Sequence, residues 1–281
     1  MFQLRSAFML VLQMKENKMK DVLVTGAYGG MGRATVKALL SEGFRVFALD
    51  RNIGDAEENI IPLEADITKE ESVKEAFHKV REYTDSLYAI IHFAGIYMLD
   101  SLVEMDSNSF QSIFDVNLGG VFLINKTFLP LLDKGSRILV TTSELAPLDP
   151  LPFTGIYAVT KGALDKYAYS LRMELQLLGI TVSVLRAGAV DTGMLGVSTD
   201  ALDRFCENTE LYTCNAGRFK KIVNRVEARC VSPERIAEKS VRIIKKHNPS
   251  FAYSINRNPL LLMLSVLPKK LQLWAIRLVL R

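Results

Sequence analysis

The chain has 281 residues, of which 49% are hydrophobic and 23% are charged. This composition is too apolar for a disordered protein, and 17 glycines and 9 prolines without a period exclude a collagen-like fibre. The three cysteines, Cys206, Cys214 and Cys230, are an odd number without a Cys-x-x-Cys pair. They argue against a disulfide framework or a thiolate zinc site and favour a reducing compartment. The three histidines are far apart in the sequence, so we expect no metal site.

The net charge of +4 is unevenly distributed. Residues 218–281 carry 15 Lys and Arg against 3 Asp and Glu, whereas the rest of the chain carries 20 against 28. A basic region of this kind suits nucleic acid, an anionic membrane surface or an anionic substrate. No other feature of the sequence supports nucleic-acid binding, so none is expected.

The N-terminal residues 1–19 include a short apolar stretch but no small-x-small cleavage site. We expect these residues to be a tail and the protein to be cytoplasmic rather than secreted. Met19 directly precedes the first predicted strand and is an alternative start.

From residue 20 onward, short apolar segments alternate with longer segments of helical periodicity. Strands without polar alternation, joined by helices, are typical of a parallel sheet covered on both faces. Right-handed connections then favour a doubly wound (Rossmann) α/β sheet of about seven strands. The predicted strands are 22–25, 45–49, 60–63, 89–93, 137–142, 181–185 and 251–255, and the predicted long helices are 31–41, 69–83, 107–132 and 157–178.

The alternation stops at residues 191–230, which have weak periodicity and mixed composition. A long irregular insertion in a compact α/β domain is usually a lid or binding loop. A helix is expected to restart after Ser232, because Ser232-Pro233 suits an N-cap followed by the first helical turn. We therefore assign one domain to residues 20–258, with a substrate lid at 191–230.

Residues 259–281 form an apolar and basic C-terminal extension. Its apolar run is shorter than the roughly 20 residues that span a bilayer. Leu271, Trp274, Ala275 and Leu278 follow helical spacing, and we expect this stripe to cap a substrate pocket or to dock on a second subunit. The alternative is a helix lying in a membrane interface, which would place the protein at a membrane surface.

A glycine-rich turn, TGAYGGMG at residues 25–32, follows the first strand and opens the first helix. Glycines let the backbone approach a pyrophosphate, and the helix N-terminus offers free N–H groups and a positive dipole end to it. Asp50 ends the second strand eighteen residues after Gly32. A carboxylate there accepts hydrogen bonds from ribose hydroxyls and repels a 2′-phosphate, which favours NAD(H). The neighbouring Arg51 pairs well with a 2′-phosphate, so NADP(H) stays open.

Tyr157 and Lys161 are spaced i, i+4 in a predicted helix, so the phenol and the ammonium can face one cleft. A nearby cation stabilises phenolate and lowers the tyrosine pKa, which suits a proton donor and acceptor for an alcohol or carbonyl. Ser143 ends the fifth strand fourteen residues earlier, and Asn117 lies in the preceding long helix.

Together these motifs, in this order over residues 20–256, resemble the short-chain dehydrogenase/reductase family in its short single-domain branch. The resemblance implies that Tyr157 is the acid/base, that Ser143 holds the substrate oxygen, and that Lys161 and Asn117 complete a proton relay. It also implies an adenine contact for Asp66 and a nicotinamide carboxamide contact for Thr192. The cofactor-binding residues expected on this basis are Gly26, Tyr28, Gly30, Met31, Gly32, Asp50, Arg51, Asp66, Ile67, Ala94, Gly95, Tyr157, Lys161 and Thr192.

The chain departs from the family pattern in three places. The usual Asn-Asn-Ala-Gly reads His92-Phe93-Ala94-Gly95, and Pro-Gly reads Ala187-Gly188. The interval from serine to tyrosine is one residue longer than expected, so Thr142 is an alternative to Ser143. We expect His92, on an apolar strand, to be structural rather than catalytic.

The C-terminal extension resembles that of hydroxysteroid and retinol dehydrogenase-like members, which implies a bulky apolar alcohol or ketone as substrate. The lid residues Met194, Leu195, Phe205, Leu211 and Tyr212 then either line the pocket or simply pack the lid. A ketoacyl or polyol substrate, and a dinucleotide-binding sensor without turnover, are the alternatives. The family also implies a homodimer or homotetramer formed through the helices at 107–132 and 157–178.

Overall fold

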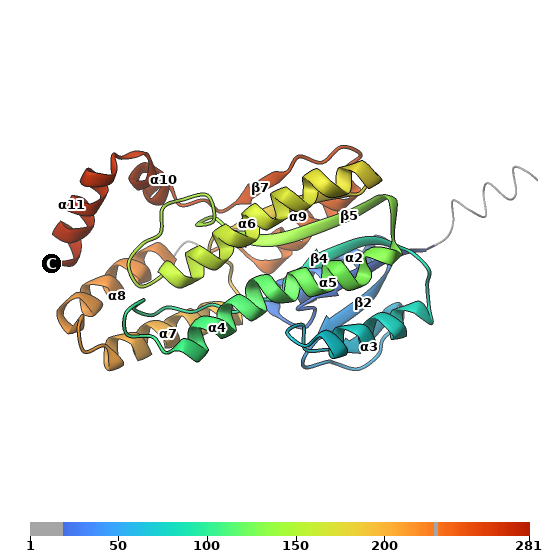
Figure 1. Cartoon of the computed structure of the whole chain (residues 1–281), viewed down its shortest axis with the longest axis horizontal. Helices are drawn as coiled ribbons and strands as arrows, with labels where there is room; N and C mark the ends of the chain where they lie inside the picture. The colour runs from blue at the N-terminus through green and yellow to red at the C-terminus, as the bar shows by residue number, and fades with distance from the viewer. Residues whose placement is uncertain (1–18, 228–229) are drawn as a thin grey trace, which may run out of the picture.

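A computed structural model describes residues 19–227 and 230–281 (Figure 1). Within these residues seven strands form one sheet in the order β3-β2-β1-β4-β5-β6-β7, and every neighbouring pair is parallel. The strands are β1 (Lys20–Thr25), β2 (Phe44–Asp50), β3 (Ile60–Glu64), β4 (Leu87–His92), β5 (Leu132–Ser143), β6 (Thr181–Ala187) and β7 (Ala252–Ile255). This confirms the doubly wound α/β sheet predicted from the sequence.

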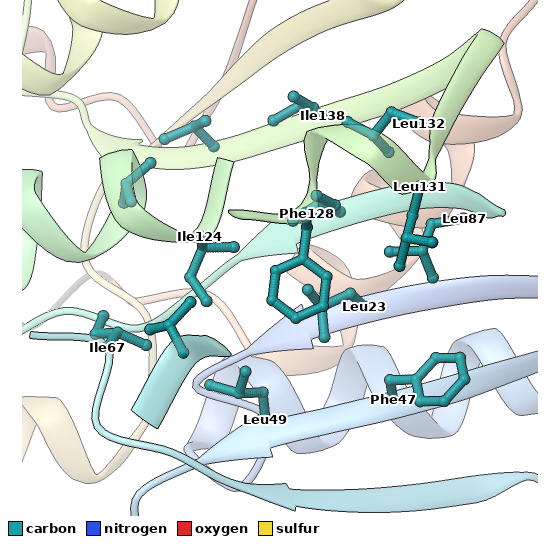
Figure 2. Close-up of a cluster of buried hydrophobic side chains, with 14 of the residues drawn as sticks. Leu23, Phe47, Leu49, Ile67, Leu87, Ile124, Phe128, Leu131, Leu132 and Ile138 are labelled. Carbon is teal, nitrogen blue, oxygen red and sulfur yellow. The ribbon is translucent and has the colours of Figure 1, made fainter. Parts of the chain in front are cut away.

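Helices cover both faces of the sheet (Figure 1). One face packs against α2 (Gly30–Ser41) and α9 (Pro233–Lys245), and the other packs against α3 (Glu70–Arg81), α5 (Gly120–Phe128) and α6 (Gly155–Leu175). Each face has its own hydrophobic cluster. Successive strand residues point to opposite faces, so Leu23 belongs to the cluster under α3, α5 and α6, whereas Val22 and Val24 belong to the cluster under α2 and α9. Figure 2 shows the cluster under α3, α5 and α6, to which β2 contributes Phe47 and α5 contributes Phe128.

The chain order reverses between β1 and β4, which are neighbours in the sheet although β2 and β3 come between them in sequence. A crevice outside the carboxyl ends of strands forms at such a switch point and is where open α/β sheets bind ligands. The glycine-rich turn follows β1 there, and Ala94-Gly95 follows β4.

The helix predicted over 107–132 is interrupted. It consists of α4 (Ser107–Phe114), a π-helical turn η1 (Asp115–Gly119), α5 and a final 3₁₀ turn η2 (Leu129–Leu131). The predicted helix 157–178 is α6 followed by a 3₁₀ turn η3 (Gln176–Leu178).

The lid region at 191–230 is not irregular, as its weak periodicity had indicated. It contains α7 (Gly193–Asn208) and α8 (Thr213–Glu227). Phe205 and Phe219 pack around Phe153, with ring centroids 4.5 and 5.2 Å from it. The lid is thus a helical pair with a core of its own, and long-range packing decides its helicity.

After β7 the chain forms α10 (Pro259–Val266) and α11 (Lys269–Leu280), which lie beyond the carboxyl ends of the strands beside α8 (Figure 1). The expected helix in the C-terminal extension is therefore present. In the part of the chain that the structure describes, no helix has the length and apolar character needed to cross a bilayer.

Candidate active site

The glycine-rich turn after β1 is too tight for side chains. Gly26 has φ +67°, and a Cβ there would lie 2.6 Å from the backbone nitrogen of Ala94. A Cβ at Gly32 would overlap the carbonyl oxygen of Gly26. Gly30 in this turn lies against the side chain of Thr192, a residue of the segment that follows β6.

The N-terminus of α2, which follows this turn, fits a pyrophosphate. Its N-cap residue, Gly29, makes no side-chain hydrogen bond to the helix, and the first turn carries no acidic residue. The first N–H groups and the positive end of the helix dipole are therefore left to an anion. These residues fit the phosphates of NAD(P), and Gly26, Gly30 and Gly32 would hold them.

Asp50 lies at the end of β2, next to the glycine-rich turn. Its carboxylate accepts hydrogen bonds from the backbone N–H of Tyr28, at 3.0 Å, and of Arg51, at 2.8 Å. The carboxylate is thus fixed beside the turn, where an adenosine ribose would lie, and the Arg51 side chain is exposed.

Asp66 and Ile67 follow β3. Asp66 accepts hydrogen bonds from the backbone and hydroxyl of Thr68, at 3.0 and 2.7 Å. Burial raises the pKa of Asp66, but these bonds outweigh it and leave the pKa below its ordinary value. Ile67 is buried, and its side chain packs against Gly120 of α5.

Asn117 lies in the π-helical turn η1 and is fully buried. Its amide donates to the Ile96 carbonyl at 3.0 Å and to the Thr160 hydroxyl at 3.2 Å, and its oxygen accepts from the Ile96 N–H at 2.8 Å. A Cβ at Gly95 would lie 3.1 Å from Asn117 Oδ1 and 3.4 Å from Lys161 Nζ. The fold therefore brings Asn117 and Lys161 to the same side of Gly95.

Tyr157 lies in the first turn of α6 beside Ser143, the last residue of β5. Burial raises the pKa of Tyr157 above its ordinary value, the neighbouring Tyr97 raises it further, and a hydrogen bond with Ser143 lowers it. The Tyr97 and Tyr157 rings are 4.9 Å apart. Thr142, the alternative to Ser143, instead donates to Asp165 at 3.4 Å. Ser143 is thus the hydroxyl that the structure places at Tyr157.

Lys161 is buried one turn further along α6. Its ammonium donates to the Thr141 carbonyl at 3.4 Å and lies 5.7 Å from the Tyr157 ring centroid. Burial lowers the pKa of Lys161 to about 8. The ammonium is therefore still protonated at neutral pH, but its proton is held less tightly than that of an exposed lysine.

A cavity of about 490 Å³ opens in front of Tyr157 and Ser143. This volume is within the range of pockets that bind small molecules. Met31, Gly95 and Thr192 line one end, and apolar side chains of α8, α10 and α11 line the other. Glu144 and Lys161 are the charged residues of its described lining. The cavity thus joins the expected nicotinamide site to an apolar chamber.

Glu144 was not singled out from the sequence. It follows Ser143 directly, lines the cavity, and accepts a hydrogen bond from the backbone N–H of Asn258 at 2.5 Å. Burial raises the pKa of Glu144, while the bond from Asn258 and the charge of Arg257 lower it. Only the extra residue between Ser143 and Tyr157 pointed to this segment. Its partner lies 114 positions away, beyond the reach of local patterns.

Of the predicted substrate residues, the three that the structure describes, Phe205, Leu211 and Tyr212, do not line the cavity. Phe205 and Tyr212 pack against Phe153 in the lid core, and Leu211 is 67% exposed. The side chains of Met194 and Leu195 lie outside the described residues. In place of this set, the cavity is lined by Phe219, Ile222, Val223, Leu261, Leu264, Ile276 and Leu280.

The C-terminal helix α11 does line the pocket, but of the predicted stripe only Ala275 takes part. The inner stripe of α11 is Gln272, Ile276 and Leu280, at four-residue spacing. The predicted Trp274 and Leu278 are 62% and 64% exposed. The other three members were predicted wrongly because most positions of α11 are apolar, so periodicity does not single out the inner face. Gln272 is buried there and donates to the Leu267 carbonyl and to Asp149.

Comparison with known proteins places this geometry in a family. Residues 20–203 match the short chain dehydrogenase family. The chain is 36% identical over 197 residues to estradiol 17-beta-dehydrogenase 2 of Mus musculus, covering 66% of this chain and 51% of the relative. It is 32% identical over 192 residues to NADPH-dependent 1-acyldihydroxyacetone phosphate reductase of Schizosaccharomyces pombe, covering 65% of each. It thus spans about half the length of the mouse relative.

Solved structures agree on the fold. A short chain dehydrogenase family protein from Francisella tularensis superposes with a TM-score of 0.71 at 23% identity, over 84% of this chain and 97% of that one. A short chain dehydrogenase from Burkholderia cenocepacia in complex with NADP gives 0.70 at 20% identity, over 92% and 96%. The family match over residues 20–203 and the shared fold show that the chain belongs to the short-chain dehydrogenase family of NAD(P)-binding oxidoreductases.

Proposed function

We propose that the protein interconverts a secondary alcohol and a ketone on a bulky apolar substrate, with NAD(P) as cofactor. The observation that carries this proposal is the position of Tyr157 and Ser143, side by side at the wall of a mainly apolar cavity. Relatives named for estradiol, for 1-acyldihydroxyacetone phosphate and for 3-ketodihydrosphingosine support an apolar substrate class.

In this mechanism the Ser143 hydroxyl holds the substrate oxygen next to the Tyr157 hydroxyl. In the reductive direction Tyr157 donates its proton to the carbonyl oxygen, and in the oxidative direction it accepts the proton of the alcohol. Bound NAD(P) would supply or accept the hydride at the substrate carbon. Burial raises the pKa of Tyr157 further above neutral pH, so the resting phenol carries the proton that the reductive direction uses.

Lys161 and Asn117 support the proton transfer by Tyr157. When Tyr157 gives up its proton, the Lys161 ammonium stabilises the phenolate, and proton return follows a path past Asn117. The lowered pKa of Lys161 predicts that this support fails as pH rises through about 8, where the ammonium loses its charge.

The test is Tyr157→Phe, assayed by nicotinamide absorbance with a panel of hydroxysteroids, retinoids, ketoacyl thioesters and polyols. We expect kcat/KM to fall by at least about 100-fold, because the phenol is the proton donor. Cofactor binding, measured by calorimetry, should be retained and should weaken far less than kcat/KM, because the glycine-rich turn and Asp50 are intact. Tyr169→Phe, in the exposed part of the same helix, is the matched control and should retain full activity.

Near-normal turnover by Tyr157→Phe would overturn the proposal. If the enzyme turns over a ketoacyl thioester or a polyol but none of the apolar alcohols, the substrate class is ketoacyl or polyol instead. Cofactor binding with no turnover across the panel would favour a dinucleotide-binding sensor.

We also propose that the cofactor is NAD(H) in preference to NADP(H). The Asp50 carboxylate, fixed by Tyr28 and Arg51, would face a 2′-phosphate with a like charge. We expect Asp50→Ser to shift the kcat/KM ratio towards NADP by about tenfold or more, since it removes that repulsion. Arg51→Ser is the matched control and should lower NADP use without affecting NAD. A wild-type enzyme that prefers NADP would contradict this proposal.

A homodimer or homotetramer through α4–α5 and α6 completes the proposal. These helices expose large apolar side chains, namely Phe110, Phe122, Val159, Tyr169 and Met173. Exposed apolar surface on two neighbouring helices favours association between subunits.

A further inference from the structure

The two C-terminal helices have two different apolar faces. The inner face lines the cavity with Leu264, Ile276 and Leu280. It is held in place by Gln272, which donates to Asp149 at 2.8 Å, and by Asn215 of α8, which donates to the Leu280 carbonyl at 2.7 Å. The orientation of the helices is therefore fixed, and so is the identity of the side chains that face outward.

The outer face of α10 and α11 is apolar and exposed. Its members are more than half exposed and belong to both helices, and they are Met263, Val266, Leu273, Trp274 and Leu278. Five large exposed apolar side chains on two short consecutive helices exceed the scattered apolar residues of an ordinary surface.

The charges around this face have one sign. Residues 239–281 contain nine Lys and Arg and no Asp or Glu. Lys270, Arg277 and Arg281 are exposed beside the apolar face, and Lys269 pairs with Asp149 of the neighbouring loop. Apolar side chains bordered by basic ones match an anionic lipid surface, where the former enter the acyl region and the latter meet the headgroups.

We propose that this outer face, made of α10 and α11, docks on an anionic lipid bilayer. A second copy of the chain fits the same face less well, because a two-fold contact would bring Lys270 and Arg277 against basic residues of the same face. At 8 and 12 residues, α10 and α11 are too short to span the bilayer, so they lie in its interface. The proposal stands on this surface alone and does not depend on the reaction.

Trp274 is the single tryptophan of the chain and lies on the outer face, so its fluorescence reports docking directly. The full chain is mixed with vesicles of equal parts phosphatidylcholine and phosphatidylserine, and with vesicles of phosphatidylcholine alone. We expect Trp274 emission to shift to shorter wavelength, and the protein to sediment, with the anionic vesicles. Binding should weaken steeply as salt is raised.

Two variants test the two parts of the face. Leu273→Ser with Leu278→Ser, neither of which lines the cavity, should weaken vesicle binding by about tenfold or more. Lys270→Glu with Arg277→Glu should weaken binding to anionic vesicles by about tenfold or more. The matched controls lie elsewhere on the surface and should bind as wild type: Leu177→Ser with Leu178→Ser in η3, and Lys79→Glu with Arg81→Glu in α3.

Unchanged Trp274 emission with anionic vesicles would overturn the proposal. So would outer-face variants that bind vesicles as wild type, or binding that disappears only when residues 1–18 are removed. Dimers that form without lipid and are lost in the same variants, with no vesicle binding, would assign the face to a second copy. Tyr157→Phe should bind vesicles normally, which separates this proposal from that of the reaction.

Discussion

His92 shows how a departure from the family pattern is accommodated at a single position. The side chain is fully buried at the end of β4, and its Nε2 lies 3.0 Å from the Asn125 oxygen. Asn125 in turn donates to the Tyr167 hydroxyl at 3.3 Å. A polar residue in an apolar layer is thus connected to two helices, α5 and α6, in keeping with the structural role expected from the sequence.

The pH dependence of stability tests this role. Burial lowers the pKa of His92 from 6.5 to about 4, so the unfolded chain binds the proton more tightly than the folded one. The stabilisation is complete above pH 6.5 and is lost as pH falls through this window to about 4, at a cost of about 3 kcal/mol. Urea unfolding at a series of pH values measures this slope.

His92→Asn should remove that part of the slope, and His78→Asn, at an exposed position of α3, should leave it unchanged. If the slopes of wild type and His92→Asn coincide between pH 4 and 6.5, His92 is not the titrating group.

Residues whose partners are close in sequence were predictable. The glycine-rich turn and the Tyr157–Lys161 pair lie within eight and five consecutive positions, so their spacing carries the information. Glu144 and the inner stripe of α11 were not predictable. Their roles depend on Asn258 and on the cavity, which only the folded chain brings together.

Among the elements, α6 and β6 are joined by a buried ion pair. Arg186 donates to Asp165 through two nitrogens, at 2.9 and 2.7 Å, and Asp165 is 7% exposed. Paired contacts of this geometry fix the two elements against each other. The pair thus ties α6, which carries Tyr157, to the strand next to β5, which carries Ser143.

We expect Asp165→Ala to lower the free energy of unfolding by about 3 kcal/mol, since it leaves a mostly buried guanidinium without its partner. Asp85→Ala is the matched control, because its pair with Arg81 is largely exposed and should contribute less than about 1 kcal/mol. Urea denaturation of both variants gives the comparison. Equal effects would mean that the Asp165 pair adds nothing beyond a surface contact.

The helix at 107–131 shows what periodicity misses in an element. Apolar residues continue through it, so the sequence predicted one uninterrupted helix. The π-helical turn adds a residue to one turn and turns Asn117 towards Ile96 and Thr160. These partners lie in two other segments of the chain, so no local spacing records them.

For the whole molecule, the doubly wound parallel sheet and its two helical layers followed from the alternation of strands and helices. The lid did not. The helices α7 and α8 are amphipathic only with respect to the cluster around Phe153, and α10 and α11 only with respect to the cavity. A segment that packs on a neighbour distant in sequence shows its pattern only once that neighbour is known.

The strand β7 links the sheet to the two C-terminal helices. It is a four-residue edge strand that pairs with β6 alone, and the chain that follows it forms the inner wall of the cavity. Edge strands exchange their amide hydrogens through local opening, well below the cost of global unfolding. Fraying of β7 would release the segment that leads into α10, while Asn215 and Asp149 still hold α11. We therefore expect the amides of β7 to exchange faster than those of the central strands, and the cavity wall to loosen without unfolding the rest of the sheet.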